Sequence, residues 1–256
     1  MVRHLLGALA LLVPASAARA DDWEALFNGK DLTGWKGKAD LWSVKDGAIT
    51  GYTKDGKIPG GNSFLVWDGS LKDFELKVQF KIVGGNSGIQ YRAKAVDKPE
   101  DFHIAGYQAD IDGSKGQGFF GILYEERGRG VLTNRGSKTW IGADGSRNEK
   151  AVEDAAELLK AIKVNDWNEY HITAKGNRLT HVINGKTFAE TIDFQADKRA
   201  AEGLLAFQIH AGMGEMTVQF KDVKLKKLSG GEVLTPETSP IPSDAKVVGG
   251  PKAKKK

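Results

Sequence analysis

Residues 74–82 read Phe74-Glu75-Leu76-Lys77-Val78-Gln79-Phe80-Lys81-Ile82, with an apolar side chain at every even position and a polar one at every odd position. Successive side chains of a β-strand point to opposite faces of its sheet, so this period of two predicts a strand with one buried face. The segments 216–220 and 170–174 repeat the alternation. We therefore expect an all-β protein whose sheets each bury one face.

Two dipeptides, Asp46-Gly47 and Asn184-Gly185, separate pairs of such segments. They predict tight hairpins, because both central residues of a type I′ turn need a positive φ. One helix is expected, over Glu149–Ile162, where apolar residues gather on one side. The predicted fold class is a sandwich of two antiparallel sheets with one short inserted helix.

The two ends of the chain differ in composition from the middle. Residues 1–20 hold Arg3, an apolar run from Leu5 to Val13 and the sequence Ala18-Arg19-Ala20, which together resemble a secretory signal peptide cleaved near Ala20. Residues 229–256 are rich in Gly, Pro, Ser, Thr and Lys, which predicts a disordered tail. One domain is expected over residues 21–228, in a secreted or periplasmic protein without a membrane span.

Charge and cysteine content exclude several classes of function. The 256 residues include 37 basic and 33 acidic side chains. Without Arg3, Arg19 and the four lysines of residues 252–256, 31 basic side chains remain against 33 acidic ones. A body so close to neutral has no field to attract nucleic acid. The chain has no cysteine, so disulfides, thiolate zinc sites and a cysteine nucleophile are excluded.

Four segments, 87–92, 107–111, 121–127 and 204–211, carry unusual polar side chains opposite their apolar ones. If they lie in one sheet, its outer face carries Gln90, Arg92, Gln108, Asp110, Gln208 and His210. Amides, a guanidinium, a carboxylate and an imidazole supply the donors and acceptors that sugar hydroxyls require. The alternative is an ordinary solvated sheet face. Such faces favour Lys, Glu and Thr, so a site is the preferred interpretation.

Individual residues allow two interpretations each. His210 is a candidate general base because imidazole titrates near neutrality, although a lone histidine in a strand is often structural. Asp110 is the better placed acid, whereas Glu125 is either a catalytic acid or part of a solvated strand end. Tyr124 and Trp140 are candidates to stack on a sugar ring, with burial in the core as the alternative.

Seven motifs occur in the order found in one known family. They are Leu26–Trp35, Gly85–Arg92, Gly106–Ile111, Gly121–Glu126, Asp166–Tyr170, Asn184–Gly185 and Gln208–Gly212. On these motifs the chain resembles the 3-keto-disaccharide hydrolase family, from about Trp23 to Leu228. The resemblance implies a concanavalin-A-like jelly-roll sandwich whose concave sheet binds carbohydrate. It also implies action on glycosides oxidised at C3 of the sugar.

A ketone at C3 makes the C2 proton acidic, so one base can remove it and the enolate can expel the C1 substituent. The expected activity is therefore cleavage of 3-keto-glycosides. Either His210 or Asp110 would be the base, and Tyr124 or Glu125 would protonate the leaving oxygen. The substrate-binding set is Gln90, Arg92, Gln108, Tyr124, Trp140 and Gln208.

No cofactor and no metal ligand are assigned, because no ligand set demands the divalent cation that could polarise the ketone. The expected partner is a sugar 3-dehydrogenase that supplies the oxidised glycoside. The main alternative is a non-catalytic, lectin-like carbohydrate-binding module, since one fold hosts many functions. A scaffold domain is a third reading. An unmodified β-glucan hydrolase is disfavoured, because the opposed carboxylates of ordinary glycosidases are missing.

Overall fold

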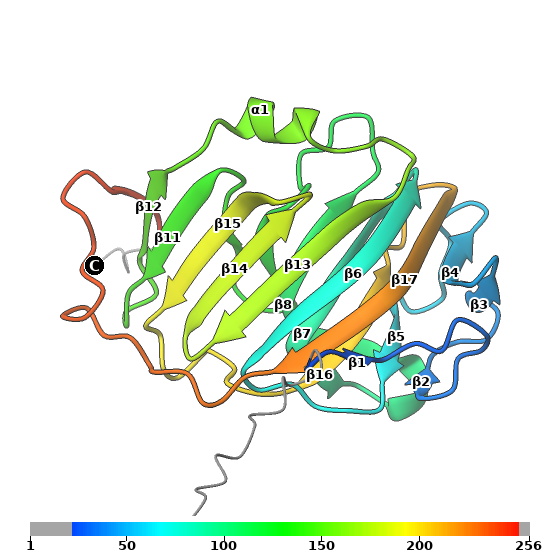
Figure 1. The fold of residues 1–256 in the computed structure, drawn as a ribbon. Helices are drawn as coiled ribbons and strands as arrows, with labels where there is room; N and C mark the ends of the chain where they lie inside the picture. Colours follow the sequence, from blue (N-terminus) through cyan, green and yellow to red (C-terminus); the bar gives the residue numbers. More distant parts are fainter. Residues whose placement is uncertain (1–21, 251–256) are drawn as a thin grey trace, which may run out of the picture.

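The structure, a computed structural model, describes residues 22–250, which fold into two β-sheets packed face to face (Figure 1). In the described range the larger sheet has 11 strands, in the order β18 (Lys246–Gly249), β12 (Arg147–Ala151), β11 (Ser137–Ile141), β15 (Lys186–Asp193), β14 (Arg178–Ile183), β13 (Asn168–Lys175), β6 (Phe74–Val83), β17 (Met216–Lys227), β4 (Ala48–Thr53) and β3 (Trp42–Lys45), with β1 (Glu24–Ala25) paired to β17. The smaller has seven, in the order β10 (Gly130–Thr133), β9 (Leu123–Glu126), β8 (His103–Asp112), β7 (Asn86–Val96), β16 (Leu204–Ile209), β5 (Ser63–Trp67) and β2 (Trp35–Lys36). Neighbouring strands are antiparallel except β11 and β15, so the predicted jelly-roll sandwich is confirmed.

The core lies between the two sheets. Strand β6 buries its even residues, from Phe74 to Ile82, and leaves the odd ones partly exposed, as the alternation predicts. Phe207 of β16 stacks on Phe220 of β17 across the core, with ring centroids 3.9 Å apart. Burial of each such phenylalanine contributes about 2–3 kcal/mol, so contacts of this kind hold the sheets together.

Both predicted hairpins are present. Asp46 and Gly47 connect β3 to β4 with φ values of 51° and 71°, and Asn184 and Gly185 connect β14 to β15 with 49° and 78°. Both central residues therefore have the positive φ that a type I′ turn needs.

The helix is shorter than predicted. Helix α1 covers only Ala155–Lys160, while residues 147–151 form strand β12 instead. Asp154 fixes the start of the helix, because its side chain accepts hydrogen bonds from the backbone N–H groups of Ala156 and Glu157. The prediction of a helix from Glu149 is wrong because β11 offers backbone partners to this segment.

The prediction of a disordered tail is wrong for residues 229–250. The Gly231 N–H donates to Asp73 at 2.8 Å and the Leu234 N–H donates to Asn177 at 2.8 Å. Further on, β18 pairs with β12. Residues 251–256 and the predicted signal peptide, 1–20, lie outside the described residues. None of the helical segments within 22–250 has the length and apolarity to cross a bilayer.

Arg92 lies between the sheets, and its predicted place on the outer face is wrong. Its φ is 46° and the pairing of β7 with β8 shifts register there, which defines a β-bulge. The extra residue reverses the alternation and turns the side chain inward. The guanidinium donates to Asp73 at 2.9 Å and to the carbonyls of Lys72 and Gly176 at 2.7 Å each.

We predict that Arg92→Met lowers the free energy of unfolding by about 3–5 kcal/mol, because it leaves the buried Asp73 carboxylate without its cation. Urea unfolding measures the change. The control is Lys57→Met, which removes an exposed partner of Asp55 and is expected to change stability by less than about 1 kcal/mol. Equal effects of the two substitutions would contradict the assigned role of Arg92.

Candidate active site

The four segments that carry the predicted polar side chains are consecutive neighbours in one sheet, in the order β9, β8, β7, β16. Their register places Gln90 opposite Gln108, and Gln108 opposite Tyr124. These strands therefore share one sheet, which is the condition on which the predicted outer face rests. Gln90, Gln108, Asp110 and Gln208 are nevertheless buried, so they form the floor of the outer face.

A chain of amides holds the Asp110 carboxylate in this floor. Asn86 Nδ2 donates to Oδ1 and Gln108 Nε2 donates to Oδ2, both at 2.7 Å. The Gln108 carbonyl oxygen accepts in turn from Gln90 Nε2. Gly88 makes room for this arrangement, because an added side-chain carbon there would lie only 2.6 Å from Gln108 Cγ.

The same chain can run in the opposite direction. Gln90 Oε1 is buried and has no hydrogen-bond partner within residues 22–250. If Asp110 binds a proton, its O–H can donate to Gln108 Oε1 once the Gln108 and Gln90 amides turn over. Gln108 Nε2 then donates to Gln90 Oε1. Because amide nitrogen and oxygen have the same shape, both protonation states of Asp110 fit this site.

Burial raises the pKa of Asp110 from 3.8 to about 7, since removal of water disfavours the charged form. The hydrogen bonds from Asn86 and Gln108 lower it, and the charges of Asp112 and Glu126 raise it further. The result is a carboxyl group that exchanges its proton near neutral pH.

Glu126 lies on this face and is half-buried, whereas the predicted acid is its neighbour Glu125. Its carboxylate accepts from Asn62 Nδ2 at 3.3 Å and from Gln208 Nε2 at 3.4 Å. Burial raises the pKa of Tyr124, and the charges of Glu126 and Asp110 raise it further. The missed signal is the alternation itself, which puts Tyr124 and Glu126 on one face.

His210 follows the end of β16 and is half-buried. Its Nδ1 lies 2.6 Å from the carbonyl oxygen of Ala211, which only accepts, so Nδ1 carries the proton. Nε2 of the neutral ring is then the basic nitrogen, and it has no hydrogen-bond partner within the described residues. The His210 backbone N–H donates to the Asn86 carbonyl at 3.2 Å, which connects this residue to the amide chain.

Glu125 points to the other face of β9, because the register sets it opposite the core residue Tyr107. Both of its oxygens accept from Arg129, at 2.8 and 2.9 Å, and Arg129 also binds Asp193 at 2.7 Å. The structure therefore places this predicted acid in a buried ion-pair network away from Asp110 and His210.

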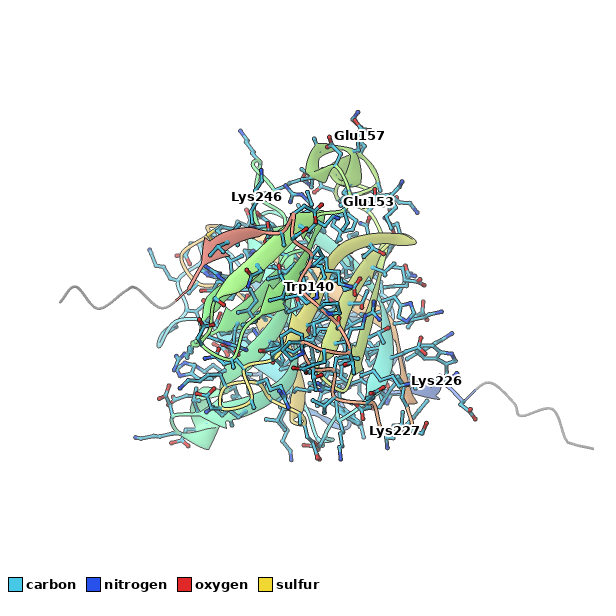
Figure 2. All side chains as sticks on the ribbon, turned by 90° about the vertical axis from the view of Figure 1, so that its left-hand side faces the viewer. Trp140, Glu153, Glu157, Lys226, Lys227 and Lys246 are labelled. Carbon is cyan, nitrogen blue, oxygen red and sulfur yellow. The ribbon has the colours of Figure 1, made fainter. Side chains whose placement is uncertain are left out.

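Trp140 lies in β11 of the larger sheet and is also outside the cluster. It is buried with Ile192 and Phe194, and Leu234 of the C-terminal segment packs against them. Figure 2 shows it at the side of the molecule along which that segment runs. The expectation that it contacts a sugar with the other candidates is wrong, because β11 belongs to the opposite sheet.

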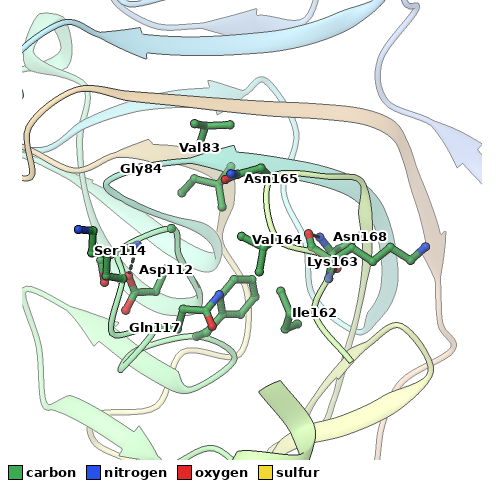
Figure 3. Close-up of a pocket in the computed structure, with 14 residues that line it drawn as sticks. Val83, Gly84, Asp112, Ser114, Gln117, Ile162, Lys163, Val164, Asn165 and Asn168 are labelled. Atoms are coloured by element: carbon green, nitrogen blue, oxygen red, sulfur yellow. Dashed lines mark hydrogen bonds between the residues drawn. The ribbon is translucent and has the colours of Figure 1, made fainter. Parts of the chain in front are cut away.

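A separate cavity of about 350 Å³ lies beside the turn after β6 (Figure 3). Residues 112–120 and 162–168 supply most of its other walls, and none of the predicted site residues lines it. Across residues 22–250, no three His, Asp or Glu side chains gather as a metal-binding group.

Comparison with known families matches residues 22–226 to the 3-keto-alpha-glucoside-1,2-lyase-like domain. The chain belongs to this family. A 3-keto-disaccharide hydrolase of Bacteroides thetaiotaomicron is 36% identical over 89 residues, which span 30% of this chain and 29% of that protein. This chain thus matches less than a third of the length of its curated relative.

Solved structures share the fold of this 3-keto-alpha-glucoside-1,2-lyase-like domain. A candidate glycosyl hydrolase of Parabacteroides distasonis has a TM-score of 0.54 at 22% identity, over 83% of this chain and 99% of that one. The carbohydrate-binding module CBM66 of Bacillus subtilis has a TM-score of 0.51 at 17% identity, over 77% and 98%. A Bacillus subtilis protein with a galectin-like fold scores 0.52 at 9% identity, over 80% and 94%.

The raised pKa predicts how Asp110 affects stability. Between about pH 4 and pH 7 the folded state holds a proton that the unfolded chain has released, so the free energy of unfolding falls as the pH rises. A pKa change from 3.8 to about 7 corresponds to a loss of about 4 kcal/mol. The Asp110→Asn variant lacks this titration and should gain stability relative to the wild type over that range.

Urea unfolding at pH 4, 6 and 8 measures this difference. The exposed Asp68→Asn is the control and should follow the wild-type pH dependence. Parallel pH profiles for Asp110→Asn and the wild type would show that Asp110 titrates in the ordinary acidic range.

Proposed function

We propose that this protein cleaves glycosides whose sugar carries a ketone at C3. The observation that carries the proposal is that His210 and Glu126, which offer a basic nitrogen and a carboxyl group, are both half-buried on one face of the sheet. Gln208 connects them, because it precedes His210 by two residues on the same face and donates to Glu126. Family membership supports the class of substrate.

The reaction needs one base and one acid. The base takes the C2 proton, and the C2–H electron pair forms an enolate with the C3 carbonyl. When that carbonyl re-forms, a C1–C2 double bond appears and the C1–O bond breaks with its electrons on the leaving oxygen. The acid gives that oxygen a proton. Addition of water across the double bond then yields the free 3-keto sugar, so the net outcome is hydrolysis.

His210 is the base in this proposal, because its Nε2 is unprotonated in the neutral ring and partly accessible. Glu126 in its protonated form is the acid, and Asn62 and Gln208 hold its carboxyl group in place. Asp110 is nearly buried and both its oxygens accept amide N–H groups, so it serves to orient the amides below the sugar. Tyr124, half-buried beside Glu126, offers a ring face to the sugar.

The proposal includes the setting of the reaction. The sequence of residues 1–20 supports export to the periplasm or beyond the cell. A 3-keto-glycoside must come from a reaction that removes two electrons and two protons from the H–C–O–H group at C3, so that both the C3–H bond and the O–H bond break. A sugar 3-dehydrogenase is the class of enzyme that supplies it.

We predict that residues 21–256 release a chromophoric leaving group from a 3-keto-glucoside and not from the unoxidised glucoside. The ketone is essential because only it makes the C2 proton acidic. Absorbance of the released group measures the rate. If calorimetry finds saturable sugar binding but neither compound is cleaved, the protein is a carbohydrate-binding module instead.

We predict that His210→Ala and Glu126→Gln each lower kcat by about 100-fold or more, the usual contribution of a general acid or base. The matched control is Glu75→Gln, which removes a carboxylate from the larger sheet. Circular dichroism checks that each variant folds. Glu126 is not the acid if Glu126→Gln keeps the wild-type kcat.

A further inference from the structure

The outer face of the smaller sheet changes from polar to apolar beyond the Arg92 bulge. Phe64, Ala93, Ile104 and Ala206 are buried there, and Val66 and Leu204 pack against them half-buried. We call these six residues the apolar cluster. It adjoins the active-site floor directly, because Ala206 pairs with Gln90 and Phe64 pairs with Gln208.

A cavity of about 160 Å³ lies over the apolar cluster. Its apolar walls are Val66, Ala95, Val96, Phe102, Ile104 and Leu204. Lys36 and Asp68, which form an exposed ion pair at 2.8 Å, lie at its border. An apolar cavity of roughly 150 Å³ holds a benzene molecule. The volume here therefore matches one six-membered carbon ring.

His103 also lines this cavity and contributes a buried acceptor. Its Nδ1 lies 2.9 Å from Asp97, whose carboxylate also accepts from Arg127. The pKa of Asp97 is lowered, chiefly by the His103 hydrogen bond, so its carboxylate is charged and Nδ1 carries the proton. In the neutral ring Nε2 then has a lone pair, and Nε2 has no hydrogen-bond partner in residues 22–250. A hydroxyl group on the ring would satisfy it.

One loop connects this cavity to the candidate acid. Gly60 lies against the His103 ring, because an added side-chain carbon at Gly60 would be 3.4 Å from Nε2. Two residues later Asn62 donates to the Glu126 carboxylate. Segment 60–62 therefore contacts both the candidate acid and His103, a residue that lines the cavity.

We propose that this cavity receives the aglycone of the glycoside, and that the preferred aglycone is a six-membered carbon ring with a hydroxyl group. The inference rests on the proposed function, because it takes Glu126 as the acid that protonates the aglycone oxygen. The apolar walls contact the ring, and Nε2 of His103 accepts a hydrogen bond from its hydroxyl group.

Cleavage of three 3-keto-glucosides tests this, with methyl, cyclohexyl and 4-hydroxycyclohexyl aglycones. All three leave as alcohols of similar acidity, so differences in kcat/KM report contacts of the aglycone. We expect the cyclohexyl compound to exceed the methyl compound by about tenfold or more, as apolar pockets discriminate. The added hydroxyl should raise kcat/KM again, and His103→Phe should remove only this second gain.

Two different substitutions in the cavity are used, so that the test does not depend on the folding of a single variant. Ala95→Trp fills the cavity from an exposed position, and Leu204→Gln makes its wall polar. Each should bring the cyclohexyl-to-methyl ratio close to one. The control Val152→Gln, on an exposed residue after β12, should keep the wild-type ratio. A wild-type ratio near one, or a ratio unchanged by both cavity variants, overturns the aglycone site.

Failure of the proposed function is a distinct outcome, seen as no cleavage of any of the three compounds. Calorimetry with the unoxidised methyl and cyclohexyl glucosides then tests, independently of cleavage, whether the cavity binds a ring. Tighter binding of the cyclohexyl glucoside that Ala95→Trp abolishes supports a ring-binding site. Equal affinities overturn it.

Discussion

The buried ion pair between Arg92 and Asp73 fixes the β-bulge that separates a polar from an apolar region on the outer face of the smaller sheet. Before the bulge β7 directs an even residue, Gln90, to the outer face, and after it the odd residues Ala93 and Ala95 take that direction. The polar floor and the apolar cluster thus meet where the alternation reverses. A buried guanidinium is tolerated because Asp73 and two backbone carbonyls satisfy it. One interaction inside the sandwich therefore decides what the outer face presents.

The amide side chains on that face are buried, whereas the polar side chains of an ordinary sheet surface are in contact with water. A half-satisfied polar network is costly in a site without water, and here Asn86, Gln108 and Gln90 reduce that cost by forming one continuous chain to Asp110. This chain of hydrogen bonds also fits a protonated Asp110, because the Gln108 and Gln90 amides can turn over and reverse the direction of the hydrogen bonds. The chain also contacts the half-buried His210, since the Asn86 carbonyl accepts the His210 backbone N–H. The floor thus contacts the His210 backbone while its own side chains stay buried.

Alternation and turn chemistry are local, so the sequence was sufficient to predict strand β6, both hairpins and the outward side chains of β7 and β8 before the bulge. That β7, β8, β9 and β16 share one sheet was a condition that only the fold could meet. Arg92 was misplaced because a bulge depends on Asp73, which is distant in the chain and contacts it only in the fold. Glu125 was preferred over Glu126, although the position of Tyr124 already implied the opposite choice. The position of Trp140 away from the site depends on which sheet contains its strand, and no local sequence pattern contains that information. The strands that carry the site and most of the side chains on its face were thus predictable. The residues whose direction depends on a partner distant in the chain were not.

The course of the C-terminal segment decides which strand forms one edge of the larger sheet. Strand β18 covers the edge of β12, and Leu234 covers the apolar group of Trp140, Ile192 and Phe194. Residues 22–226 match the family, so this covering lies after the matched region. A chain that stopped at Leu228 would retain every residue of the candidate active site and yet present an unpaired strand beside exposed aromatic rings. The segment therefore moves this edge of the larger sheet from the five-residue β12 to the four-residue β18, and very short edge strands are among the features that limit pairing with other chains.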